Sequence, residues 1–185
     1  QSFFFFFLGA GSFQFTNAMR VGGNNSQFFK MVITKKAATV EKNRVWLNLT
    51  NSNGLFKQLL VGYVAGATNG FDNLYDGLSY NGNAYVDFYS INNNKNLTIQ
   101  ARAVPFDKTD QVPLGYKSTI DGSLYISIDN RDGVLSYQEI WLEDKKEGVT
   151  YNLTKGKYSF TAIKGGEDNR FVLKFSNKTL VVDNN

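Results

Sequence analysis

Apolar residues recur at every second position along most of this chain, and that spacing constrains its fold more than any other sequence feature. The pattern is clear from Val45 to Leu49 and from Phe171 to Phe175. Alternation with a period of two places one face of a β-strand in the core and the other in solvent. No window of ten or more residues sustains the helical period of 3.6. The sequence therefore predicts an almost all-β chain of antiparallel strands. Two further segments alternate in the same way, with these residues on the inner face: Leu97, Ile99, Ala101 and Ala103; Leu124, Ile126 and Ile128.

Tight turns separate the alternating segments. Dipeptides such as Asn53-Gly54 and Asp121-Gly122 favour the positive φ angles of two-residue reversals. The Asp121-Gly122 turn is expected to join residues 116–120 to residues 123–128 as a β-hairpin. Many short strands with turn residues between them predict an antiparallel β-sandwich of the jelly-roll or immunoglobulin-like type.

The alternation is interrupted twice. Residues 66–83 are the least strand-like and are expected to form a long surface loop. Residues 103–112 also break the pattern. We expect two consecutive β units, an N-terminal β-sandwich part of residues 1–104 and a C-terminal immunoglobulin-like part of residues 105–185. The alternative is that residues 103–112 only connect two sheets of a single domain.

Two missing residue types exclude several kinds of chemistry. The chain has no Cys, so it forms no disulfides, thiolate metal sites or cysteine nucleophiles. It has no His either, which removes the side chain most often used as a general base and as a transition-metal ligand. No spacing among the 16 acidic residues singles out a carboxylate pair of the kind that hydrolyses glycosides. The sequence therefore predicts a protein that is not an enzyme.

The distribution of charged and apolar residues argues against two classes of partner. The 20 basic residues exceed the acidic ones by four, but they are scattered singly or in pairs. A protein that binds nucleic acid usually clusters its positive charge, so no nucleic acid is expected. The apolar run at residues 3–8 is far shorter than the roughly 20 residues of a membrane helix. We expect a buried strand there and no membrane insertion.

Carboxylates are concentrated in and just after the loop at residues 66–83. Asp72, Asp76 and Asp87 are candidate calcium ligands, because calcium is bound by several oxygens from flexible backbone. The alternative is that these side chains accept hydrogen bonds from their own backbone in turns. No cofactor other than calcium is expected.

Aromatic side chains form the other candidate site. Trp46 and Trp141 lie in alternating segments, where either can face outward beside Tyr85, Tyr89 or Tyr125. An exposed row of aromatic rings binds sugars by stacking, with hydrogen bonds that orient the ligand. The alternative is that the two tryptophans are ordinary packing residues between strands.

Several segments from Arg44 onward carry a resemblance to a known class of protein. They are RVWLNLTNSNGLFKQLLVGYVAGATNGFD, YVDFYSINNNKNLTIQARAVPFD, VPLGYKSTIDGSLYISIDNRDG, IWLEDK and FVLKFSNKTL. Together they resemble the region that precedes the C-terminal sorting domain in type IX secretion cargo proteins of Bacteroidota. The resemblance implies a secreted protein at the outer cell surface, with a sorting domain that would follow Asn185. The phenylalanine run at residues 3–7 departs from the usual sequence of this region.

Cargo proteins of this class include adhesins, hydrolases and filament-like surface proteins, and a shared fold does not supply a function. The resemblance implies a non-catalytic structural or adhesive β-sandwich module of a surface protein. Its expected partners are upstream passenger domains and the type IX secretion machinery, with other surface proteins or glycans in addition. The alternative is a carbohydrate-binding module appended to a secreted hydrolase, and a hydrolase domain is a third class.

Overall fold

Strands make up most of the structure. The computed structural model describes residues 42–80 and 83–176, and all of them belong to one unit that spans residues 39–185. These residues form eleven strands and two short 3-10 helices, with no α-helix among them, so the all-β prediction is confirmed. The elements are β1 (Lys42–Thr50), β2 (Phe56–Val64), β3 (Gly77–Leu78), β4 (Val86–Asn92), β5 (Lys95–Arg102), β6 (Gln111–Ser118), β7 (Gly122–Arg131), η3 (Gly133–Ser136), β8 (Trp141–Asp144), β9 (Val149–Asn152), η4 (Leu153–Lys155), β10 (Tyr158–Ala162) and β11 (Gly165–Lys174).

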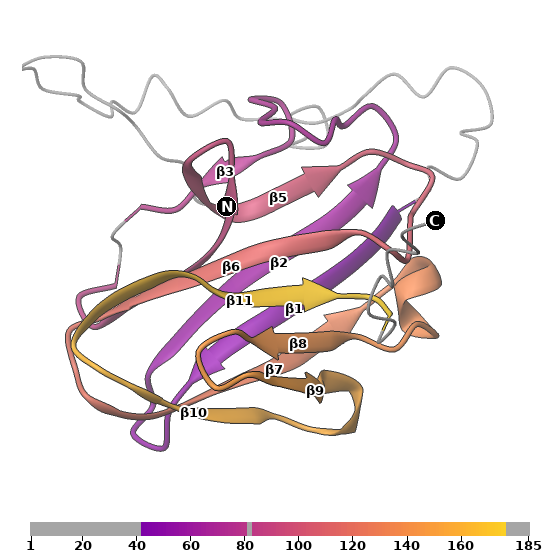
Figure 1. The fold of residues 1–185 in the computed structure, drawn as a ribbon. Coiled ribbons are helices and arrows are strands. Elements are labelled where there is room, and N and C mark those ends of the chain that lie inside the picture. Colours follow the sequence, from indigo (N-terminus) through magenta and orange to yellow (C-terminus); the bar gives the residue numbers. More distant parts are fainter. Residues whose placement is uncertain (1–41, 81–82, 177–185) are drawn as a thin grey trace, which may run out of the picture. The chain divides into compact units, whose positions relative to one another are not determined.

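The described strands form one curled sheet. Ten of them follow the order β10-β7-β1-β2-β5-β4-β6-β11-β8-β9, and β3 pairs with β5. The sheet bends back on itself until it is nearly closed and barrel-like (Figure 1). At the closing ends, the ring of Tyr151 on β9 lies 5.6 Å from the ring of Tyr158 on β10. Ten of the eleven described strands therefore lie on one hydrogen-bonded path, and rings from its two end strands, β9 and β10, are in contact.

One hydrophobic core fills the inside of this curled sheet. The inner residues expected on β1, Val45, Leu47 and Leu49, are fully buried, as are Phe171 and Leu173 on β11 and Phe175 directly after it. Strands on both sides of residue 104, the expected domain boundary, contribute to this one core. The arrangement fits the alternative in which residues 103–112 only connect parts of one domain. The core also includes Leu59, Val61, Tyr63, Val86, Phe88, Val112, Leu114, Tyr116, Leu124, Ile126, Leu142 and Phe160.

The predicted inner face of β5 is wrong at its centre. Leu97 is buried, but Ile99 is 43% exposed and Gln100 is only 1% exposed. Ala101 is buried as expected, so the alternation is broken at Ile99, and Gln100 and Ala101 are both buried. The other surprise is pairing: β5 runs parallel to β2, whereas all other neighbours among the described strands are antiparallel.

The predicted hairpin at Asp121-Gly122 is also wrong. The turn exists, and Gly122 has the positive φ of 126° that the dipeptide favours. However, β6 pairs with β4 and β11, whereas β7 pairs with β1 and β10. The turn therefore carries the chain from one side of the curled sheet to the other. A turn motif specifies a local reversal, but burial against distant strands selects the pairing partner.

Two further predictions concern the loop at residues 66–83 and the apolar run at residues 3–8. The loop at residues 66–83 is largely irregular where it is described, with only the two-residue strand β3 inside it. The strand expected at residues 3–8 lies outside the described residues. Within the described part of the chain, no helix has the length and apolar character that crossing a membrane requires.

The core makes a direct prediction about stability. Replacing the fully buried Leu47 by Ala removes apolar contacts and leaves a cavity, so the free energy of unfolding should fall by about 2–5 kcal/mol. Replacing Leu74, which is 89% exposed, by Ala should change it by less than about 0.5 kcal/mol. Urea denaturation followed by fluorescence measures both. Equal effects of the two substitutions would contradict the core described here.

Candidate functional site

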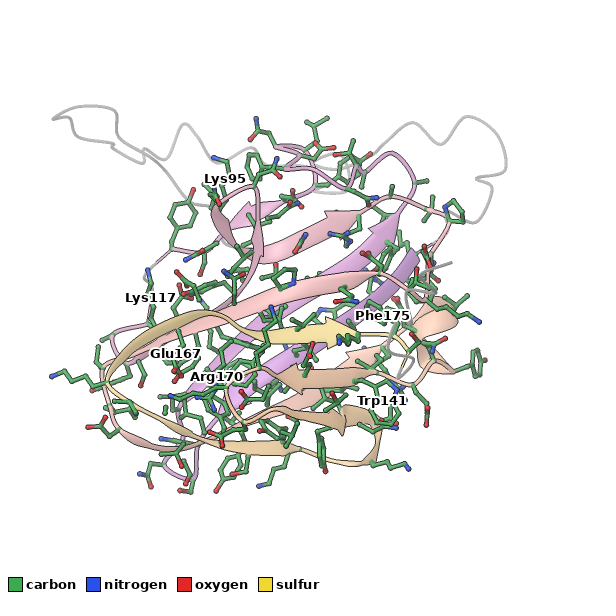
Figure 2. All side chains as sticks on the ribbon, viewed as in Figure 1. Lys95, Lys117, Trp141, Glu167, Arg170 and Phe175 are labelled. Atoms are coloured by element: carbon green, nitrogen blue, oxygen red, sulfur yellow. The ribbon has the colours of Figure 1, made fainter. Side chains whose placement is uncertain are left out.

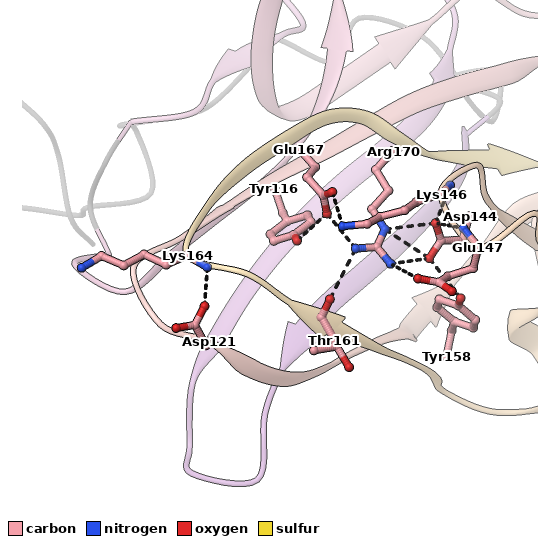
Figure 3. Close-up of polar contacts among 10 residues, drawn as sticks. All are labelled: Tyr116, Asp121, Asp144, Lys146, Glu147, Tyr158, Thr161, Lys164, Glu167 and Arg170. Carbon is pink, nitrogen blue, oxygen red and sulfur yellow. Dashed lines mark hydrogen bonds and ion pairs between the residues drawn. The ribbon is translucent and has the colours of Figure 1, made fainter.

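A buried arginine lies where the ends of the curled sheet approach each other. The Arg170 side chain on β11 is 2% exposed, and the Asp144 side chain on β8 is 1% exposed. Arg170 Nη2 lies 2.8 Å from Asp144 Oδ2, and Arg170 Nε lies 3.0 Å from Asp144 Oδ1. Two parallel charge-assisted hydrogen bonds of this kind fix both distance and orientation. The pair is shown in Figure 3.

Further polar contacts connect this ion pair to β6 and β10. Arg170 Nη1 lies 2.7 Å from Glu167 Oε2, and the Tyr116 hydroxyl of β6 donates to the same carboxylate at 2.7 Å. On β10, the Tyr158 hydroxyl donates to Asp144 at 3.0 Å. We call these five residues, Tyr116, Asp144, Tyr158, Glu167 and Arg170, the seam cluster. It connects β8 and β11, near one end of the sheet, to β10 at the other end.

The charges in the seam cluster shift one another's pKa values. Burial disfavours the Asp144 and Glu167 carboxylates, but hydrogen bonds from Arg170 and other donors outweigh it. The pKa of Asp144 is therefore lowered, and that of Glu167 falls to about 2. Burial, together with the neighbouring carboxylates, raises the pKa of Tyr116 and of Tyr158 to about 12. The carboxylates and the guanidinium are thus charged at neutral pH, and the two tyrosines are neutral hydrogen-bond donors.

An irregularity in β11 directs its polar side chains to two places, the seam cluster and Tyr89 of β4. The register between β11 and β6 shifts between Glu167 and Phe171, and Asn169 has a positive φ of 58°. Glu167 and Arg170 join the seam cluster, whereas Asp168 accepts a hydrogen bond from the Tyr89 hydroxyl of β4 at 2.5 Å. A strand with strict alternation does not divide its residues in this way.

Asp168 lines a groove of about 690 Å³ formed by the start of β4, the end of β6 and the start of β11. We call it the Tyr85 groove. Figure 2 marks Lys117, from the end of β6, on this side of the sheet. The Tyr85 side chain is 61% exposed. Thr119 holds the backbone of Tyr85, because its N–H and its hydroxyl donate to the Tyr85 carbonyl at 2.9 and 3.3 Å.

The candidate calcium ligands Asp72 and Asp76 serve the backbone of their loop. The Asp76 carboxylate accepts hydrogen bonds from the Asp72 N–H at 2.8 Å and the Ala101 N–H at 2.7 Å. The Asp72 carboxylate accepts one from the Leu74 N–H at 3.0 Å. The contacts tie the loop to itself and to β5, which matches the alternative given for these residues.

Asp87, the third candidate ligand, is engaged elsewhere. Its carboxylate lies 3.3 Å from Lys57 Nζ and accepts hydrogen bonds from the Ser79 hydroxyl and the Phe88 N–H. In residues 42–80 and 83–176, no group of three or more Asp, Glu, His or Cys side chains is arranged to hold a metal ion. The structure therefore does not bring the three aspartates together into one ligand set.

The two tryptophans are separated as well. Trp46 lies on the outer side of β1 beneath the Arg44 guanidinium, whose carbon is 4.8 Å from the ring centroid. Trp141 lies on β8, which is not a neighbour of β1, and lines a different cavity of about 400 Å³ with Phe175. The buried indole N–H of Trp141 has no hydrogen-bond partner among the described residues. The two rings do not form one row.

The three tyrosines named with the tryptophans have different environments. Tyr85 lines its groove, Tyr89 is buried, and Tyr125 lies beneath the Lys157 ammonium group at 4.0 Å from the ring centroid. Sequence reasoning thus included Tyr85 but missed the cationic and acidic residues beside it. It also missed Arg170, for which the available signal was a charged residue directly before an apolar run in a predicted strand.

Acid should weaken the seam cluster. The folded-state pKa of Glu167 is lowered to about 2, so its stabilising contribution is complete above the unfolded value near 4.5. That contribution is lost as the pH falls from about 4.5 to about 2, and the lowered pKa of Asp144 acts in the same direction. Chemical denaturation at a series of pH values should show the free energy of unfolding decreasing across this window.

Two matched variants isolate the cause of this acid effect. Arg170→Met leaves Asp144 buried without its cation, which should cost about 3–5 kcal/mol at neutral pH and flatten the acid dependence. Lys174→Met removes an outward-facing ion pair to Glu143 on the same two strands, 24% and 31% exposed, and should cost less than about 1 kcal/mol. If both variants keep the full acid dependence, the seam cluster is not its source.

The loop contacts of Asp76 yield a separate prediction. Asp76→Ala leaves two backbone N–H groups without their acceptor, so the free energy of unfolding should fall by about 1–3 kcal/mol. Calorimetry of the wild-type chain should give the same melting temperature with and without added calcium. Asp107→Ala, in an exposed turn, is the control. A calcium-dependent rise that Asp76→Ala abolishes would instead support the calcium site.

Comparisons with known proteins give one match. No curated protein and no solved structure matches the chain. A family model, described as a domain of unknown function, DUF8693, matches residues 1–175. The match covers most of the 185 residues. The chain therefore belongs to the DUF8693 family.

Proposed function

We propose that this chain is a non-catalytic structural or adhesive β-sandwich module of a secreted protein at the outer cell surface, exported by type IX secretion. Two sides of the curled sheet face each other across a single core, which supports the sandwich description. The partners are the upstream passenger domains and the secretion machinery. Support for the export route comes from the sequence segments that resemble type IX cargo.

The seam cluster is the observation that carries the structural role. A sheet with two end strands exposes unpaired backbone groups that invite unfolding, proteolysis or pairing with other chains. Here β9 and β10 form those ends, and Tyr158 of β10 is bound to Asp144 of β8. Arg170 Nη1 also donates to the Thr161 carbonyl of β10 at 3.4 Å. The buried charges thus hold the ends of the sheet together without a disulfide.

A module at the cell surface is exposed to proteases and has no ATP-dependent chaperones to refold it. Such a module lasts longer if its folded sheet rarely opens. Proteolysis of a rarely opened protein follows its free energy of unfolding when reclosing is fast. Two aromatic rings add cation–π contacts to these polar contacts. The Arg170 guanidinium carbon lies 4.8 Å from the ring centroid of Phe160 and 5.0 Å from that of Phe171. The same contacts that close the sheet therefore serve the proposed function.

Surface display tests this proposal. The chain is placed between an inert reporter and a type IX sorting domain in a bacterium that has this secretion system. The wild-type module should carry the reporter intact to the cell surface. Arg170→Met should reduce the intact surface reporter at least about tenfold, because the opened module is cleaved, and thermolysin should cut the purified variant at least about a hundredfold faster.

Lys174→Met is the matched control, since it removes an ion pair between the same strands on the outer face. It should behave as wild type in both assays. Equal surface levels of intact reporter for Arg170→Met and wild type would count against the structural role. Turnover of a polysaccharide, ester or peptide by the purified chain would count against a non-catalytic module.

A further inference from the structure

We infer that the Tyr85 groove is a binding site for a neutral oligosaccharide. The inference rests on the adhesive form of the proposed function and assigns that adhesion to specific residues. The groove's volume of about 690 Å³ lies within the range of about 300–1,000 Å³ typical of sites for small ligands. The ligand chemistry follows from three features of the groove: an exposed ring, a mixed set of polar groups and an open stretch of backbone at Gly165.

Tyr85 supplies an exposed aromatic surface on a backbone that is held by hydrogen bonds. The Tyr85 side chain is 61% exposed and lines the groove, so its ring is accessible to a ligand. Its backbone is held on both sides, because Tyr85 N–H donates to the Asn83 carboxamide oxygen at 2.9 Å and Thr119 N–H donates to the Tyr85 carbonyl. A ring on a rigid backbone loses little conformational entropy when a ligand stacks on it. The apolar face of a sugar ring matches such a surface.

The polar groups around the ring include both donors and acceptors. Lys117 and Lys164 bring ammonium groups, and Figure 3 shows the Lys164 side chain extending away from the seam cluster. Asp168 brings a carboxylate that the Tyr89 hydroxyl orients at 2.5 Å. Sugar hydroxyls donate to a carboxylate and accept from an ammonium group, so they satisfy both kinds.

The charge balance favours a neutral ligand over an acidic one. Asp87, which also lines the groove, is paired with Lys57 at 3.3 Å. The carboxylate of Asp168 then offsets one of the two lysine charges, Lys117 and Lys164. An acidic polysaccharide or a nucleic acid requires a strong excess of positive charge, which this groove lacks.

Gly165 and Gly166 shape the floor of the groove in different ways. At Gly165 no side chain fills the space above the backbone, since no neighbouring atom lies within 4 Å of the point where a Cβ would stand, and its φ of 127° disfavours any other residue. At Gly166, a Cβ would come within 2.9 Å of Lys117 Cγ. Gly166 therefore allows the Lys117 stem to lie flat on the strand. A ligand can therefore approach the backbone closely at Gly165, whereas the Lys117 stem covers Gly166.

Isothermal titration calorimetry with cellohexaose, xylohexaose and mannohexaose tests the inference on the whole chain. At least one of these neutral oligosaccharides should bind saturably. Tyr85→Ala should weaken that binding at least about tenfold, and Lys117→Gln should weaken it severalfold. Tyr137→Ala changes a tyrosine that is 94% exposed but outside the groove, and it should leave the affinity unchanged.

Melting temperatures separate this inference from the structural proposal. Tyr85→Ala should melt at the wild-type temperature, because the ring is mostly exposed, so lost binding reflects the groove and not unfolding. No binding of any hexaose, or equal binding by wild type and Tyr85→Ala, would overturn the inference and leave the structural role intact. Binding of hexagalacturonate alone would also overturn it, since that ligand is acidic.

Discussion

The buried pair of Arg170 and Asp144 is the interaction on which the closure of this sheet depends. Both side chains are almost completely inaccessible, so neither charge is solvated by water, and each relies on the other. Arg170 also donates to Glu167, Tyr158 donates to Asp144, and Tyr116 donates to Glu167. An apolar contact would close the sheet over a range of positions, whereas paired charges with defined directions hold β8, β10 and β11 in one arrangement.

The irregular stretch of β11 relates this closure to the proposed binding groove. Between Glu167 and Phe171 the strand departs from simple pairing with β6, and its side chains serve two sites. Arg170 and Glu167 stabilise the seam, while Asp168, between them in the chain, lines the Tyr85 groove. One wall of the groove, at Asp168, thus lies between two residues whose side chains are hydrogen-bonded in the seam cluster. A binding site built on such a wall is preorganised.

Sequence periodicity found most strands but neither site. Val45, Leu47 and Leu49 alternate cleanly, and each is buried as expected because β1 lies in the middle of the sheet. At Ile99 and Gln100 that expectation fails, since Ile99 is exposed and Gln100 is buried where β5 pairs with β2 and with the irregular register of β3. The residues of the seam cluster lie up to 54 positions apart in the sequence, from Tyr116 to Arg170, and no local pattern links them.

The sequence by itself determined the all-β character, the inner faces of most strands and the exclusion of Cys and His chemistry, because these depend only on residue type and short-range spacing. Tertiary structure alone decided which strands pair, as the Asp121-Gly122 turn shows by joining two strands that are not neighbours. It also decided which charges meet in the core and where a groove opens. Pairing depends on the burial of residues far apart in the chain, and the spacing of neighbouring residues does not encode it.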